Sequence, residues 1–146
     1  MTGESDLRTL LAGMAPRLHP DLYVFATLPP GQPVPPGADP RMTFREEEGT
    51  SLILTAAAAQ AVGIPGSFPC RMITLEIHSA LAAVGFLAAI IPALAHAGMG
   101  VNPVAAFHHD HLFIPADRAN DAMVILRRIA GEAGGSSSPV TPSQHL

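Results

Sequence analysis

The alternation of hydrophobic and polar positions predicts helices and short strands along the first part of the chain. Apolar side chains recur at helical spacing after Ser5, which is expected to cap a first helix that Pro16 ends. Residues 22–28 (LYVFATL) combine aromatic and β-branched side chains, a composition that is typical of a strand. Six prolines and two glycines between residues 29 and 40 are incompatible with a packed element and predict a loop.

The same patterns organise the rest of the chain. Apolar and polar side chains alternate over residues 72–77, which predicts a strand with one face in the core. A long apolar helix is expected to follow and to close at Gly98, and residues 108–110 are expected to join two strands in a hairpin. The other expected elements are a polar stretch at 44–49, a buried strand at 51–55, an Ala-rich helix at 56–62, strands at 101–107 and 111–114, a last helix from Asp117 and a tail after Gly131. This order indicates an α+β fold of the split βαβ, ferredoxin-like type, in which helices cover one face of an antiparallel or mixed sheet.

Composition and charge exclude several classes of partner. Eight Arg and no Lys stand against twelve acidic residues, so the chain lacks the basic stripe that a nucleic-acid binder needs. Its longest uncharged apolar run, residues 80–95, is shorter than the roughly 20 residues of a membrane span. The single cysteine, Cys70, excludes an internal disulfide and fits a reducing cytoplasm, where we expect the protein to reside. Charged residues make up only 14% of the chain, so we expect an apolar surface that a second copy covers in a homo-oligomer.

The side chains most capable of binding a metal ion or a ligand are concentrated in the run His108, His109, Asp110 and His111. On a strand His109 and His111 share a face, so they can present two imidazoles to one anion or to one metal ion. Zinc requires three or four ligands, and only His78 or Asp110 is placed to complete the set. Three readings stay open: a metal-dependent enzyme built on this cluster, histidines that contact a small ligand, or a hairpin whose turn contains His109 and Asp110 while His111 bonds a nearby carboxylate. We expect no metal and no cofactor.

The other candidate residues give weaker indications of a binding or catalytic role. Glu47 lies in an acidic run, where it either supplies a carboxylate for the amino group of a ligand or belongs to a solvated face. His78 and Ser79 are adjacent in sequence, which directs their side chains to different faces and argues against a Ser–His dyad. Cys70 is expected to be a small buried thiol rather than a nucleophile. We therefore expect no catalytic residues.

Four segments of the chain resemble those of ACT domains: residues 44–54 (FREEEGTSLIL), 73–90 (ITLEIHSALAAVGFLAAI), 97–106 (AGMGVNPVAA) and 108–115 (HHDHLFIP). Over residues 3–130 the chain is similar to small bacterial ACT-like proteins that hold two such halves, here 1–70 and 71–131, followed by a flexible tail at 132–146. The resemblance implies a ferredoxin-like βαββαβ sheet with helices on one face. It also implies a regulatory module without catalysis that binds an amino acid or a similar small molecule between modules. A plain dimerisation module without ligand is the remaining alternative.

One position departs from the family pattern. ACT modules typically open the first helix with an acidic residue followed by Pro-Gly, whereas this chain has His78-Ser79 and Val84-Gly85. The departure alters the usual amino-acid pocket and leaves the identity of the ligand open. We expect the helix to begin near Val84, with a ligand carboxylate on the backbone N–H groups at Val84 and Gly85. The other residues expected to border this site are Glu47, His78, Ser79, Asn102, His109, Asp110 and His111.

Overall fold

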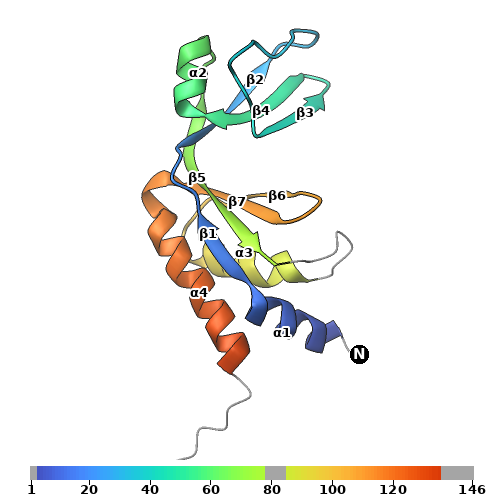
Figure 1. Ribbon diagram of the computed structural model, residues 1–146, viewed down its shortest axis with the longest axis vertical. Coiled ribbons are helices and arrows are strands. Elements are labelled where there is room, and N and C mark those ends of the chain that lie inside the picture. The colour runs from blue at the N-terminus through green and yellow to red at the C-terminus, as the bar shows by residue number, and fades with distance from the viewer. Residues whose placement is uncertain (1–2, 78–84, 136–146) are drawn as a thin grey trace, which may run out of the picture.

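The computed structural model describes residues 3–77 and 85–135 of the chain. These residues form a layered arrangement of helices and strands (Figure 1). In chain order the elements are α1 (Gly3–Gly13), β1 (Ala15–Leu18), β2 (Tyr23–Leu28), β3 (Met42–Glu46), β4 (Gly49–Thr55), α2 (Ala56–Val62), β5 (Ser67–Glu76), α3 (Phe86–His96), β6 (Asn102–Ala105), β7 (Asp110–Pro115), a 3-10 turn (Ala116–Arg118) and α4 (Ala119–Gly135). No helix in the described ranges is long and apolar enough to cross a membrane.

Strand β5 is the centre of an antiparallel sheet of seven strands formed by the described residues. The strand order is β3-β4-β2-β5-β7-β6, and β1 pairs with the same edge of β5 as β2 does. The first part of β5 pairs with β2 and the second part with β1, while β7 runs along the other edge. A single long strand therefore joins the β2–β4–β3 part of the sheet to the β7–β6 part. The sheet curls so that the β3–β4 and β6–β7 hairpins project to the same side of the molecule (Figure 1).

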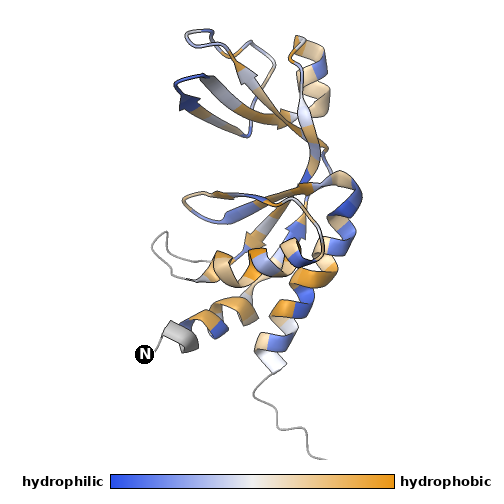
Figure 2. Ribbon diagram, turned by 180° about the vertical axis from the view of Figure 1, so that it is seen from behind, coloured by the Kyte–Doolittle hydropathy of each residue, from blue (hydrophilic) through white to orange (hydrophobic). Residues whose placement is uncertain are grey.

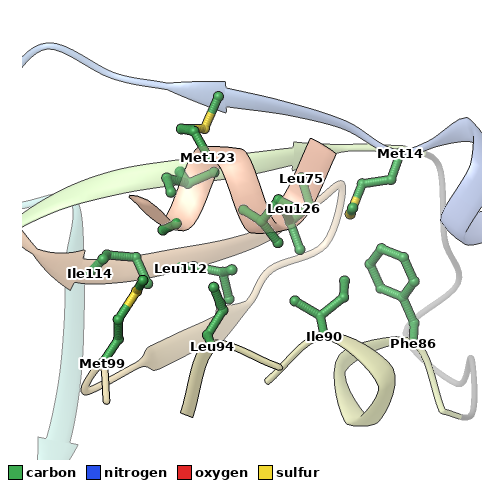
Figure 3. Packing of buried hydrophobic residues seen from close by; sticks show 12 residues of the cluster. Met14, Leu75, Phe86, Ile90, Leu94, Met99, Leu112, Ile114, Met123 and Leu126 are labelled. Carbon is green, nitrogen blue, oxygen red and sulfur yellow. The ribbon is translucent and has the colours of Figure 1, made fainter. Parts of the chain in front are cut away.

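Helices cover one face of this sheet. Successive residues of a strand face opposite sides, so alternate side chains of β5 and β7 point towards α1, α3 and α4. They form what we call the helical core, which is apolar throughout (Figure 3). Its buried members are Met14, Ile73, Leu75, Phe86, Ile90, Leu94, Met99, Leu112, Ile114, Ala122, Met123 and Leu126. Helix α2 packs over β2 and β4 in the same way, with Ala59 against Val24 and Leu54. The expected α+β fold, an antiparallel sheet with helices on one face, is confirmed.

The opposite face of the sheet, the helix-free face, is covered by no helix of the described residues. Tyr23 pairs with Cys70 in the ladder, so their side chains share this face, and Phe113 joins them from β7. Ile53 and Met72 are buried beside them. The rings of Tyr23 and Phe113 meet edge to face, with centroids 5.8 Å apart, a favourable arrangement for aromatic rings. This face therefore has a small apolar centre of its own between the two hairpins.

The N-terminal segment packs with the C-terminal part of the chain. Strand β1 pairs with β5 in a register that runs from Ala15 opposite Glu76 to Leu18 opposite Ile73. Helix α1 contacts α4 and α3, and Leu7 packs against the helical core. Residues 3–18 thus complete a core whose other buried members all follow residue 70. The division of the chain between residues 70 and 71 remains a prediction.

Some elements match the sequence-based expectations closely. Helix α2 spans the expected residues 56–62, because the Thr55 side chain accepts the N–H of Ala58 at 3.1 Å and Gly63 ends the helix in the left-handed conformation. Helix α3 begins at Phe86, close to the expected start near Val84. Figure 2 shows the hydrophobic residues along α1 and α3 and the hydrophilic residues at the tip of the β3–β4 hairpin.

Other boundaries differ from the expectations. Ser5 lies inside α1 rather than capping it, and Pro16 belongs to β1, a strand that the sequence analysis missed. Part of the polar stretch 44–49 forms β3, whose exposed side chains show no apolar alternation because β3 is an edge strand. Helix α4 continues through Gly131 to Gly135, so residues 132–135 of the expected flexible tail are helical, and residues 136–146 lie outside the described residues. Strand β5 begins at Ser67, five residues before the expected start, because pairing with β2 extends it.

Candidate functional site

Gly85 sets the geometry at the N-terminal end of α3. Its backbone is left-handed, with φ 88° and ψ −10°, a conformation that glycine adopts without steric cost. Its carbonyl accepts the N–H of Ala89 at 2.9 Å, but no side chain of the described residues caps the helix. Among the described residues, the first-turn N–H groups therefore have no side-chain acceptor, and they carry the positive end of the helix dipole. Such an end favours a negatively charged group.

The β6–β7 hairpin brings His109 to the end of β5. The turn is closed by a hydrogen bond from the N–H of Ala106 to the carbonyl of His109 at 3.1 Å. His109 Nδ1 lies 3.3 Å from the carbonyl oxygen of Ile77, the last described residue before the segment that leads to Gly85. Asp110 is the first residue of β7 and pairs with Leu75, so the expectation that it forms the turn with His109 is wrong.

His111 faces away from α3. Leu112, its neighbour, belongs to the helical core, so the alternation along β7 places His111 on the helix-free face. There Thr74 Oγ1, which is buried, lies 2.9 Å from His111 Nδ1 and 2.7 Å from His19 Nε2. The hydrogen-bond partner of His111 is therefore the Thr74 hydroxyl, and the expectation of a carboxylate partner is wrong. The sheet separates His111 from Gly85, and the structure does not bring these two candidates into one site.

The remaining candidates lie elsewhere. Asn102 pairs with Phe113 at the end of the β6–β7 hairpin opposite to the turn that holds His109, and its side chain is exposed. Glu47 lies in the exposed turn between β3 and β4, at the far end of the sheet order. His78, Ser79 and Val84 lie outside the described residues. Of the expected site, the structure thus places His109 beside the end of β5 and Gly85 at the start of α3.

Burial and neighbouring charge shift several pKa values. Burial is the main cause that lowers the pKa of His111, and the nearby His109, His19 and Arg41 lower it further. Burial first, then the charges of Arg17 and Arg41, lower the pKa of His19 in spite of the opposing influence of Glu76 and Asp21. These two imidazoles are therefore neutral at pH 7.

Two groups next to the histidines also shift. Burial raises the pKa of the Asp110 carboxyl, against a smaller opposing influence of His109. Burial raises the pKa of the Cys70 thiol to about 12, and Cys70 is fully buried. The expectation that Cys70 is a buried, unreactive thiol is confirmed, because the thiolate is the nucleophilic form.

The metal interpretation of the histidine run finds no set of ligands in the described ranges. There, no three side chains among His, Cys, Asp and Glu lie together in a way that holds a metal ion. His109 and His111 are 6.5 Å apart between ring centroids and are nearly perpendicular, at 85°. Two imidazoles alone are fewer than the three or four ligands that zinc requires.

Sequence reasoning missed three residues that surround His111. His19, Arg41 and Thr74 meet it only because β5 pairs with β7 and the segment before β3 folds onto the same face. His19 and Thr74 are 55 residues apart in the chain, so no local spacing relates them. The alternation over residues 72–77 did indicate that Thr74 lies opposite to the core face, which was the one available signal.

Comparisons with known proteins agree with this geometry. Two family models, each described as an ACT domain, match residues 2–71 and residues 67–128. The chain belongs to the ACT-domain family. Together the two ACT matches extend over both hairpins and the long strand β5 that joins them.

Several solved structures share the fold of this chain. A protein of unknown function from Vibrio cholerae, described as a possible transport protein, is 37% identical, with a TM-score of 0.79; the match covers 88% of this ACT-domain chain and 99% of that one. An Agobacterium tumefaciens protein is 17% identical with a TM-score of 0.69, over 80% of this chain and 89% of that one. The ligand-free regulatory subunit of aspartate kinase from Thermus thermophilus is 14% identical with a TM-score of 0.56, over 79% and 97%. The last two show a shared fold. No curated protein matches the chain.

Proposed function

We propose that this ACT-domain protein is a regulatory module without catalysis of its own, which binds an amino-acid-like small molecule at the N-terminal end of α3. The first turn of α3 after Gly85 carries this proposal, because no described side chain caps it and its N–H groups suit a carboxylate. Membership of the ACT family supports the regulatory role. A fold shared with the regulatory subunit of an aspartate kinase is consistent with it. The fully buried Cys70 thiol fits a reducing compartment, so we place the protein in the cytoplasm.

The glycine at position 85 provides the test of the site. We expect Gly85→Ala to abolish a ligand-induced thermal shift, because the new methyl group narrows the approach to the first turn of α3. The same change strains the left-handed backbone and lowers the stability of the free protein by about 1–2 kcal/mol. Gly98→Ala is a matched control at the other end of the helix, since Gly98 has φ 80° and the guanidinium of Arg118 would lie 4.0 Å from a Cβ there. The measurement is thermal melting with and without each common amino acid.

The pair of variants separates binding from strain. A ligand at 100 times its Kd stabilises the wild type by about 2.7 kcal/mol, which a melting curve resolves. We expect Gly98→Ala to keep this shift and Gly85→Ala to lose it, although both lose similar stability without ligand. A shift retained by Gly85→Ala would refute the site at α3. The absence of any shift in the wild type would refute ligand binding and favour a plain dimerisation module.

We also propose that the protein forms homodimers. Strand β3 is an open edge of the sheet and exposes Phe44, whose accessible fraction is 64%, and the β6–β7 hairpin exposes Phe107, at 76%. The opposite edge strand, β6, contains Pro103, and proline cannot donate a ladder hydrogen bond. Strand β3 is thus the edge that is better suited to pairing.

Self-association is expected to be visible by sedimentation velocity at high micromolar concentration. We expect a species of twice the 15.2 kDa chain mass, and Phe44→Glu is expected to shift the population towards the monomer, because it places a charge beside the open edge. Phe107→Glu serves as the control at a second exposed phenylalanine. A wild-type protein that sediments only as a monomer would contradict the proposal.

A further inference from the structure

The helix-free face contains a cavity that the ligand site at α3 does not use. Its volume is about 350 Å³, within the range of small-molecule pockets. It lies between the two hairpins and β5, so residues far apart in the sequence meet there. The lining includes Arg41, Met42, Met72, Val104, His111 and Phe113.

Arg41 places a positive charge at this cavity, and contacts with its neighbours fix the orientation of its side chain. Its backbone N–H donates to the carbonyl of Ile53 at 2.6 Å, and its Nε donates to the hydroxyl of Tyr23 at 3.2 Å. The guanidinium carbon lies 6.0 Å from the centre of the Tyr23 ring, a cation–π contact that fixes its orientation. The ion pairs of the described chain are Arg17 with Glu76 and Arg118 with Asp121, so Arg41 forms no ion pair with a described carboxylate. Its terminal N–H groups therefore remain available for an anion.

His111 supplies a second donor. The Thr74 hydroxyl has one proton, so it donates to one of its two imidazole neighbours and accepts from the other. When Thr74 donates to Nδ1 of His111, the neutral imidazole carries its proton on Nε2. Nε2 makes no hydrogen bond with the described residues, whose contacts to His111 use Nδ1. A carboxylate in the cavity favours this tautomer, because Nε2–H can then donate to it, and Thr74 and His19 act as positioning residues that hold the His111 ring.

The rest of the lining is apolar. Met42, Met72, Val104 and Phe113 present thioether, methyl and aromatic surface to the cavity. No Asp or Glu belongs to this lining, so nothing there matches the ammonium group of an amino acid. Asp21 and Asp39 line a different pocket, and Arg41 is the residue that lines both that pocket and this cavity. The chemistry of the cavity is therefore that of one anionic group joined to an apolar tail.

We propose that this cavity is a second ligand site, which binds a small monocarboxylate with its carboxylate between Arg41 and His111 and its aliphatic tail against Met42 and Met72. The site is independent of the one proposed at α3, because the sheet lies between them. It admits acids that lack an amino group, and the absence of an acidic residue in its lining selects against zwitterions.

Methionine methyl resonances locate the binding directly. The probe is 4-methylpentanoate, and its uncharged isostere 4-methylpentanamide is the matched control. We expect saturable shifts of the Met42 and Met72 methyl signals in the wild type, whereas Met99 and Met123, in the helical core, stay unchanged. The amide is expected to bind about tenfold more weakly or worse, since a charge-assisted hydrogen bond contributes about 1.5–3 kcal/mol. This comparison needs no variant.

Variants then test the two donors. Arg41→Gln and His111→Asn are each expected to raise the Kd of 4-methylpentanoate about tenfold or more. Arg45→Gln on the exposed β3 and His108→Asn in the hairpin are the matched controls and are expected to leave the Kd unchanged. The Gly85→Ala variant is also expected to bind the probe as the wild type does.

Three results would overturn the proposal. The first is the absence of saturable shifts at Met42 and Met72 up to about 10 mM probe, a concentration that detects a millimolar Kd. The second is equal affinity for the acid and the amide. The third is an unchanged Kd in a folded Arg41→Gln variant. None of these results bears on the thermal shift at α3, so the proposals for the two sites are tested independently.

Discussion

Leu112→Ala is expected to lower the free energy of unfolding by about 2–5 kcal/mol, the range that truncation of a fully buried leucine produces. Leu112 is wholly inaccessible to solvent and lies in the helical core between β7 and α3 (Figure 3). It pairs with Ile73 on β5 and Pro103 on β6, so the strands on both sides hold its backbone in place. The structure therefore cannot collapse easily into the space that the substitution leaves, and a cavity remains.

Chemical denaturation measures this loss. The midpoint in urea should fall without a change in the slope, because the surface exposed on unfolding is nearly the same. Leu22→Ala is the control: Leu22 is 43% exposed, and we expect a change within about 0.5 kcal/mol. A loss below about 1 kcal/mol for Leu112→Ala would contradict the placement of Leu112 in the core, and with it the placement of His111 on the opposite face.

Gly49→Ala is expected to destabilise the protein by about 3 kcal/mol or more, because strain and a backbone overlap act together. Gly49 opens β4 with φ 151°, a conformation that residues with a side chain rarely adopt. A Cβ there would lie 2.1 Å from the carbonyl oxygen of Leu28 on β2, so the paired strands would have to separate. Leu28 pairs with Thr50, the next residue, which leaves little freedom for such a shift.

Gly31→Ala is the matched control for this prediction. Gly31 also has a positive φ, 81°, but no atom lies within 4 Å of the position of its Cβ. We expect only the backbone strain there, about 1–2 kcal/mol, measured by the same urea titration. Equal losses for the two variants would show that the contact with Leu28 contributes nothing. The structure shows that the missing side chain of Gly49 makes room for the chain's own backbone at Leu28.

The candidate site shows which of its features the spacing of residues along the chain can predict. Gly85 was expected next to the start of a helix, and α3 does begin at the following residue, because apolar periodicity and the glycine both mark this boundary. His109 and His111 were grouped by their spacing of two residues. Only the ladder between β5 and β7 showed that His111 shares its face with Phe113 and not with α3. Periodicity states which residues share a face but not which face is covered.

The sequence by itself determined the class of fold, the helices at 56–62 and after Gly85 and the strand at 22–28. Each of these depends on local preferences for backbone conformation and on burial periodicity. Tertiary structure alone decided the strands β1 and β3, which are short edge-paired segments without apolar alternation. It alone also joined His19, Thr74 and His111 and placed Arg41 beside them. These contacts depend on which strands pair and in which register, and pairing is set by the burial of whole faces rather than by any residue's neighbours in the chain.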